Sequence, residues 1–485
     1  MIQQNNLRAA CLASPLPKKD DTCLGRALPA MLVVLLLALT GCTLAPEYIR
    51  PEAPIPNVYP ADEATNTSEM VSWREFFKDP TMQKVIDQAL QNNRDLRIAM
   101  LNVEKTRAMY RIQQADLLPT VAAGTSSQSQ YVPSEFSPLG SAVIDRQYTA
   151  SLGFSGFELD LFGRIRSLTE AAIENYHSTE NDARRARLTL VAEVAALYLQ
   201  TVSDRELRDI TADTYKSRKT THDMIRRQYE TGIASLLAVN QAKTGMEEAR
   251  SSLARLETKV AQDENALTFL VGASLPANLP NVRRLKDVAK LPDVPAGMPS
   301  TLIERRPDIV SAEHLLKATN ANIGAARANF FPRIAITAGT GYLSSEFSRL
   351  FSGVAETWNL AGQATLPIFD MGRNIAILQG SMRDKDIAIA VYEKTIQQAF
   401  REVADSLVQR QNIGELINAQ ASLLDATRQT YNLAQSRYDV GIDNLLTLLD
   451  AQRSNYGAEQ AYIGALLLRE TNALMLYKAL GGGWR

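Results

Sequence analysis

Apolar positions along this chain follow two different periods, and the changes between them divide it into segments. From residue 163 to residue 230, and again from 373 to 440, proline is absent and apolar residues recur at the three-and-four spacing of an α-helix. Each stretch corresponds to about 100 Å of helix at about 1.5 Å per residue. No compact globule holds such a helix, so the pattern predicts long bundled helices over 163–231 and 373–440.

A second helix is predicted after each long one, beyond a glycine turn. The first of these helices carries a heptad seam of ten positions in which only Asp263 is polar, as in a coiled coil. The pattern predicts helices over 235–271 and 443–478, with turns at Gly232 and Gly441. The seam positions are Val239, Ala242, Met246, Ala249, Leu253, Leu256, Val260, Asp263, Leu267 and Leu270.

Two segments change to a period of two, which is typical of β-strands. They cover about residues 120–159 and 333–369, and each is long enough for a pair of strands. Such alternation fits the wall of a membrane barrel, and it also fits one face of a soluble antiparallel sheet. The clearest run places four apolar residues on one face: Tyr148, Ala150, Leu152 and Phe154.

The sequence contains an internal repeat of one unit. Residues 115–119 match residues 328–332, and residues 229–233 match residues 438–442. The period of about 210 residues is far longer than that of a solenoid repeat, so it indicates a duplicated domain. The expected divisions are repeat 1 over 81–272 (opening with a helix over 81–116), a linker over 273–298, repeat 2 over 299–480 and a tail over 481–485.

Residues 1–41 have the features of a secretory signal. A basic region precedes the apolar run 30–39, and Leu-Thr-Gly-Cys42 closes it like the box of a bacterial lipoprotein. An ordinary signal with a chance cysteine is the alternative, and the true translation start stays open. Cleavage would leave Cys42 as the only cysteine, which a lipid anchor explains. Thr43 in place of aspartate favours the outer membrane, and residues 42–80 form a proline-marked tether.

Composition narrows the function classes. The 485 residues carry a net charge of -1, so the basic field of a nucleic-acid binder is missing. The run 30–39 is half as long as a membrane-spanning helix requires. Three histidines and no phosphate-binding loop indicate no enzyme, no cofactor and no metal site. Lys243-Thr244-Gly245 matches a penicillin-binding motif, but it stands inside the heptad helix and we treat it as a coincidence.

The strand count predicts an oligomer. One chain offers four strands, whereas even small barrels need about eight. An open sheet in lipid would leave backbone groups without partners, so several chains must combine. Three chains would supply twelve strands.

These features resemble those of the outer-membrane efflux factors of the TolC/OprM type, in the lipoprotein branch that serves resistance–nodulation–division (RND) multidrug pumps. The resemblance implies an α+β membrane protein, a homotrimer whose twelve-stranded outer-membrane β-barrel continues into a long periplasmic α-helical barrel. It also implies an equatorial belt that includes the linker 273–298. It covers residues 40–485, and its most specific motifs lie at 39–42, 73–77, 158–164, 305–309, 448–453 and 477–484.

The resemblance also assigns a periplasmic gate. Leu446 and Asp450 are four residues apart on one helix face, so in a trimer they would form an apolar ring and an acidic ring. Tyr438 matches a family tyrosine that tethers neighbouring hairpins, and Arg453 is the expected salt-bridge partner nearby. Some members keep an aspartate where this chain has Ala238, so the acceptor for Tyr438 stays open.

The two helical turns are the expected contacts of a periplasmic adaptor (membrane fusion) protein. The residues assigned there are Tyr229, Gly232, Leu236, Leu237, Gly441 and Leu445.

The implied function is a palmitate-anchored outer-membrane channel with a periplasmic tunnel. It would passively conduct drugs or other small toxic compounds from an RND pump and its adaptor to the exterior, and so support antibiotic resistance. The alternatives are a duct for type I protein secretion or metal-ion efflux, and a coiled-coil envelope spacer. A spacer needs neither the strand alternation nor the acidic gate position. The cargo and the pump served are not identified by the sequence.

Overall fold

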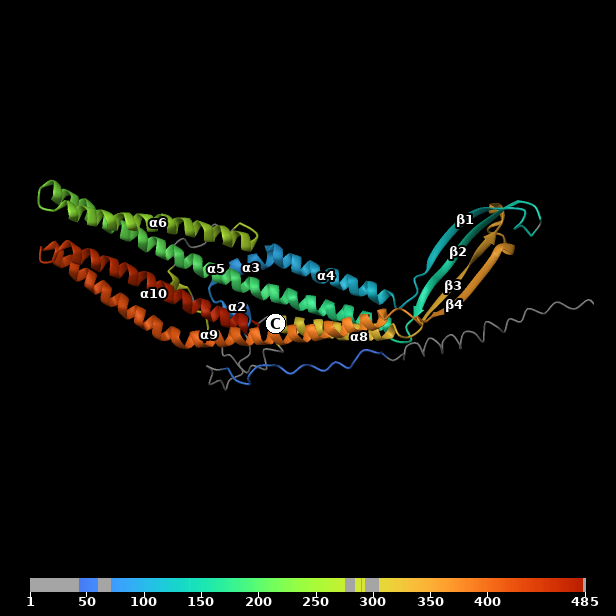
Figure 1. Ribbon diagram of the computed structural model, residues 1–485. Helices are drawn as coiled ribbons and strands as arrows, with labels where there is room; N and C mark the ends of the chain where they lie inside the picture. The colour runs from blue at the N-terminus through green and yellow to red at the C-terminus, as the bar shows by residue number, and fades with distance from the viewer. Residues whose placement is uncertain are drawn as a thin grey trace, which may run out of the picture. The chain divides into compact units, whose positions relative to one another are not determined.

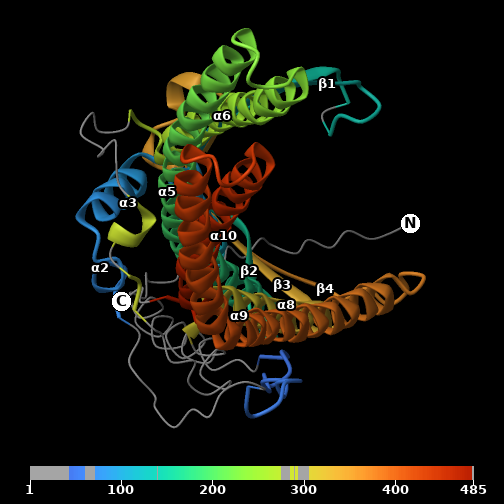
Figure 2. The same cartoon turned by 90° about the vertical axis from the view of Figure 1, so that its left-hand side faces the viewer.

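The computed structural model describes residues 43–59, 71–138, 140–274, 284–288, 290–292 and 305–482. Cys42 and the predicted signal 1–41 lie outside these residues, as do most of the linker and the end of the tail. The chain divides into a sheet unit, made of Asp116–Ser167 and Gly324–Asn374, and a helical unit that holds most of the remaining chain. Figures 1 and 2 show the same structure from two directions.

The sheet unit is a four-stranded antiparallel sheet in chain order (Figure 1). Its strands are β1 (Ala122–Val132), β2 (Val143–Leu159), β3 (Arg333–Ser344) and β4 (Glu356–Thr365). The β2–β3 register shifts between Phe154 and Phe157, where Gly156 has a φ of 65°. The outer strands β1 and β4 each pair on one side only among the described residues.

An aspartate lies in each connection between a strand and the long helix that follows it. Oxygens of Asp160 accept hydrogen bonds from the Ile165 and Arg166 amides at 3.1 and 2.8 Å. In the second repeat, Asp370 accepts from the Asn374 amide at 3.0 Å. A carboxylate at a helix start satisfies amides that have no partner in the helix and complements the helix dipole. This explains why aspartate precedes both helix starts.

The helical unit is built on two hairpins (Figure 1). In one, α6 (Leu236–Val271) runs back along α5 (Arg164–Glu230); in the other, α10 (Leu445–Ala479) runs back along α9 (Arg373–Asp439). Each long helix has 67 residues. Among the described residues, no helix is both long enough and apolar enough to cross a membrane.

Glycine makes both turns possible. Gly232 has a φ of 80° and Gly441 a φ of 77°, in the left-handed region that side chains with a Cβ disfavour. The next amide, of Ile233 or Ile442, donates back to a carbonyl of the long helix at 2.8 or 2.9 Å. Ser235 and Asn444 then cap the returning helices, which explains why each helix starts one or two residues later than predicted.

The helix expected over 81–116 is two helices, so that prediction was wrong. α3 (Pro80–Asn92) and α4 (Arg94–Ala115) are separated at Asn93, whose backbone is extended. The side-chain Nδ2 of Asn93 donates to the Leu270 carbonyl at 2.7 Å, and its Oδ1 accepts from the backbone amide of Leu96 at 2.8 Å. Asparagine favours such local bonds over an unbroken helix, and the contact with α6 stabilises the break.

The sequence motifs at 73–77, 305–309 and 477–484 contact one another in the helical unit. In α2 (Trp73–Phe76) and just after it, Phe76 and Phe77 are fully buried, and Phe76 stacks on Tyr477 of α10 at 4.2 Å. Arg306 precedes α8 (Pro307–Ala328) and donates to Asp308 at 2.7 Å, to Glu402 of α9 at 2.9 Å and to the Ala479 carbonyl at 2.7 Å. The arginine therefore joins three helices.

The polar break in the heptad seam is half of a buried carboxyl pair. Asp263 is 3% exposed and faces Asp204 of α5, which is 5% exposed. Lys259 places its Nζ 2.5 Å from Asp263 Oδ1 and 4.0 Å from Asp204 Oδ2. Burial first, and then a hydrogen bond with Asp263, raises the pKa of Asp204 to about 6.

This pair predicts an acid-stabilised hairpin. A carboxyl whose pKa is higher in the fold than in the unfolded chain stabilises the fold below its unfolded pKa, and this stability is lost as pH rises through about 6. Asp204→Asn should therefore be more stable than the wild type at pH 7.5, on the order of 2 kcal/mol. The difference should close near pH 4. Thermal unfolding across pH measures it, with Asp209→Asn as control; parallel curves would contradict the prediction.

Candidate functional site

The turns of the two hairpins expose apolar side chains. Every tip residue assigned from the sequence lies in or beside a turn, and Leu445 is half-buried. Ile233 and Ile442, which the sequence analysis did not single out, are more exposed than Tyr229 or Leu236. Exposed apolar groups that gather at one end of two hairpins are typical of an interaction surface. The exposed members are Tyr229, Ile233, Leu236, Leu237, Val440, Ile442 and Leu446.

The two turns differ in charge. At the second turn Arg437 and Asp443 form a two-pronged ion pair at 2.7 and 3.0 Å. The hydrogen bond from Arg437 lowers the pKa of the Asp443 carboxyl. The corresponding residues of the first turn are Gln228 and Ala234, which cannot make such a pair. The two turns therefore share a backbone conformation, but only the second carries this ion pair.

The proposed gate residues share one exposed face of α10. Leu446 is 61% exposed, and Asp450 is exposed one turn further on. Leu448 and Ala451, which alternate with them, are buried against the helical unit. Leu446 and Asp450 therefore do not support the packing of this chain. Asp450 forms an ion pair with Arg453 on the same helix, as expected from the sequence.

Tyr438 has a partner in the other hairpin. Its ring is partly buried, and the Gln228 side chain of α5 lies close enough to its hydroxyl to act on its pKa. Burial first, and then the charge of Asp439, raises the pKa of the Tyr438 hydroxyl, while Gln228 opposes the rise. Gln228 acts on this hydroxyl as a donor, so it does not supply the acceptor that Ala238 lacks. A glutamine one turn before a helix end carries no distinctive sequence signal, so the sequence analysis missed it.

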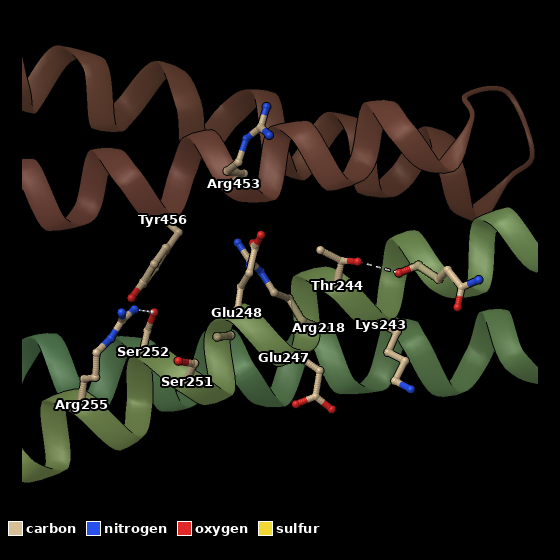
Figure 3. A pocket seen from close by; sticks show the side chains of 12 residues that line it. Arg218, Lys243, Thr244, Glu247, Glu248, Ser251, Ser252, Arg255, Arg453 and Tyr456 are labelled. Atoms are coloured by element: carbon tan, nitrogen blue, oxygen red, sulfur yellow. Dashed lines mark hydrogen bonds and ion pairs between the residues drawn. The ribbon is translucent and has the colours of Figure 1, made fainter.

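Arg453 also lines a groove between the hairpins (Figure 3). The groove has a volume of about 920 Å³. Figure 3 shows Tyr456 pointing from α10 toward the α5–α6 hairpin, from which Arg218 and Glu248 point back, whereas Arg453 stays beside α10. The remaining lining residues are Asn240, Lys243, Thr244, Glu247, Ala249, Ser251, Ser252 and Arg255.

The described residues offer little for catalysis or metal binding. No group of three or more histidine, cysteine, aspartate or glutamate side chains among them could hold a metal ion. His177 and His314 lie 5.2 Å apart between ring centres, and each has a glutamate beside it. The chemistry that the gate face can perform is steric and electrostatic: a leucine restricts passage and a carboxylate attracts cations.

Known proteins match this chain over most of its length. A family described as "Outer membrane efflux protein" matches residues 85–273 and 298–482. The antibiotic efflux pump outer membrane protein ArpC of Pseudomonas putida is 48% identical over 460 residues, covering 93% of this chain and 95% of that protein. The toluene efflux pump outer membrane protein TtgC of the same species has the same identity and coverage.

A solved structure extends the match to the fold. The open-state outer membrane channel MtrE of Neisseria gonorrhoeae is 35% identical, with a TM-score of 0.83 over 92% of this chain and 99% of that one. At this identity, the similarity covers the fold as well as the sequence family.

Proposed function

The chain belongs to the outer membrane efflux protein family, and on that premise we propose that it forms the exit duct for antibiotics and apolar solvents. It is the outer-membrane channel component of an efflux pump. The observation that supports the proposed gate is the exposed face of Leu446 and Asp450, on a helix whose alternate residues are buried. A face that supports no packing within the chain is free to line a pore.

The duct is proposed to be a homotrimer with a twelve-stranded barrel. Among the described residues of one chain, β1 and β4 keep one unpaired side each, and unpaired strand edges are costly in lipid. β1 of one subunit pairing with β4 of the next would close the sheet. Four strands per chain then require three chains for twelve strands.

The trimer has a direct test. Native mass measurement in detergent should give three subunits, because only a closed ring of strands removes every edge. Chemical crosslinking should give a ladder that ends at the same size. A stable monomer in the same detergent would contradict the proposal.

The gate is proposed to lie at the hairpin turns. Three copies of Leu446 would narrow the pore, and three copies of Asp450 would attract cations there. Tyr438, which lies beside Gln228 of the other hairpin, and Arg453, which lines the groove between the hairpins, would hold the hairpins in the narrow arrangement. The exposed tip residues Tyr229, Gly232, Leu236, Leu237, Gly441 and Leu445 would contact a periplasmic adaptor, and an inner-membrane RND pump would supply the energy.

Cys42 is proposed to carry the lipid anchor. It follows the lipoprotein-like sequence and would be the only cysteine after signal cleavage. Cys42→Ser should therefore lose all labelling by radioactive palmitate. The variant should still sediment with the outer membrane, because burial of twelve strands binds lipid more strongly than one or two acyl chains. Finding the mature variant wholly in the soluble periplasmic fraction would contradict the barrel.

Transport itself is tested by complementation. A strain without its own outer-membrane efflux channel should regain efflux of a fluorescent drug when this chain and a matching pump and adaptor are expressed. The pump and adaptor without the chain are the control. Recovery of protein secretion or of metal tolerance alone would favour a type I secretion duct or a metal-ion efflux duct. No recovery despite correctly inserted trimers would favour a structural spacer.

A further inference from the structure

Arg218 is a buried cation of α5 in the helical unit, with contacts to two other helices. It projects from α5, and its side chain is 8% exposed. Its Nη1 donates to the Gly245 carbonyl of α6 at 2.9 Å and lies 3.6 Å from Glu248 Oε2 of the same helix. Its guanidinium carbon lies 5.8 Å from the ring centre of Tyr456 on α10, within cation–π range. We call Arg218, Gly245 and Tyr456 the hairpin clamp.

Tyr456 is itself bound to α5. Its hydroxyl lies 2.7 Å from Thr211 Oγ1, and Thr211 is fully buried. Gln460 of α10 donates to the same hydroxyl at 2.9 Å. One aromatic side chain of α10 is therefore held by two residues of the other hairpin, two turns apart on α5.

Gly245 gives space for the guanidinium. A Cβ at this position would lie 3.8 Å from both Cδ and Nη1 of Arg218, in ordinary contact, so alanine fits and a longer side chain does not. Glycine forms helices less readily than alanine. The Gly245 carbonyl accepts a hydrogen bond from Arg218, and the missing side chain leaves space for the guanidinium. Within the Lys243-Thr244-Gly245 sequence, Gly245 therefore has a structural role, while the match to a penicillin-binding motif stays a coincidence.

The clamp occurs once in the repeated design. The second repeat has Thr427 where the first has Arg218, and Ser454 where the first has Gly245. Neither residue can reproduce a buried guanidinium against a helix backbone. A contact whose residues occur in both repeats can form twice in each chain, whereas the hairpin clamp can form only once.

We propose that Arg218 is the positioning residue that couples the α5–α6 hairpin to α10 and so keeps the gate face of α10 in its narrow arrangement. The inference rests on the proposed gate at Leu446 and Asp450. Tyr456 follows Asp450 by less than two helical turns, so a movement of the gate residues relative to α5 would also move the ring relative to Arg218. Arg453 lies between them on α10 and lines the same groove.

The first measurement is the distance between the hairpins. Ser251→Cys on α6 and Ser454→Cys on α10, both exposed, take spin labels for distance measurement by double electron–electron resonance in purified trimers. Arg218→Met should broaden the distribution and favour longer distances by about tenfold in population, the factor that corresponds to one lost hydrogen bond to a charged group. Arg218→Lys should recover part of the effect, because it keeps the charge and loses the planar fork.

Matched variants separate the clamp from general damage. Gly245→Ala should leave the distances unchanged, whereas Gly245→Leu should displace the guanidinium and reproduce Arg218→Met. Arg208→Met, on the same helix, removes an arginine paired with its neighbour Asp209 and should have no effect. If Arg218→Met fails to assemble, Gly245→Leu carries the test. An unchanged distribution in both variants would overturn the proposal.

Conductance distinguishes a failed clamp from a failed gate. If Arg218→Met lengthens the distances and raises conductance in planar bilayers, the coupling is supported. If it lengthens the distances while replacement of Leu446 and Asp450 leaves conductance unchanged, the clamp stands and the gate assignment falls. If the gate variant conducts better and Arg218→Met changes neither quantity, the gate stands and the clamp is wrong.

Discussion

Replacing Leu446 and Asp450 together with alanine should open the periplasmic end of the duct. Both side chains are exposed on one face of α10, and neither packs in the seam that Leu448 and Ala451 occupy. Their removal should therefore widen the constriction and leave the fold intact. In planar bilayers the double variant should conduct better, and it should select cations less strongly because three carboxylates are lost.

Cells provide an independent measurement of the same change. A widened duct should admit vancomycin, which is too large for the narrow state, so cells that express the variant should become sensitive to it. The control replaces one leucine and one aspartate that are exposed on α9, Leu423 and Asp425, with alanine. Unchanged conductance with a normal yield of trimer would place the constriction elsewhere, and the gate assignment would fall with it.

Loss of Arg306 should destabilise the protein more than any surface change. Its side chain is 9% exposed and bridges Asp308, Glu402 and the end of α10. Arg306→Met would leave the half-buried Asp308 without this cation, and breaking a fully buried pair, the upper bound for this loss, costs about 3–5 kcal/mol. Thermal unfolding followed by circular dichroism should show a large fall in the midpoint at neutral pH.

The pH dependence identifies the cause of that loss. Burial alone would raise the pKa of Asp308, but Arg306 outweighs it and holds the pKa below its usual range. Stability from a lowered carboxyl pKa is present above the unfolded value, near 4, and is lost as pH falls through the folded value. The difference between wild type and Arg306→Met should therefore shrink in acid. Adding Asp308→Asn should recover part of the loss; no recovery would mean that lost packing dominates.

Local patterns were sufficient to predict the elements of the fold. The helical spacing and the absence of proline indicated both long helices to within a residue or two of the observed ends. Gly232 and Gly441 marked the turns because only glycine adopts a left-handed backbone without strain. The heptad seam anticipated the buried face of α6, and the exposure of Leu446 beside a buried Leu448 followed from the same register.

The break at Asn93 could not be predicted in this way. The segment 81–116 has a helical pattern throughout, and asparagine is tolerated inside helices. The break depends on the Leu270 carbonyl, 177 residues away in the chain, which accepts from the Asn93 side chain. The same holds for Gln228, whose contact with Tyr438 is decided by how two hairpins lie together.

The sequence by itself determined the duplicated plan, the lengths of the hairpin helices, the turns and the face on which the proposed gate residues stand. These properties follow from backbone preferences and from periodicity, which act over a few residues. Only the tertiary structure decided the partners of the buried charges: Arg218 with Gly245 and Tyr456, Asp204 with Asp263, and Arg306 with Asp308 and Glu402. A buried charge must be paired wherever a partner comes close, and which groups come close depends on the packing of segments distant in the chain.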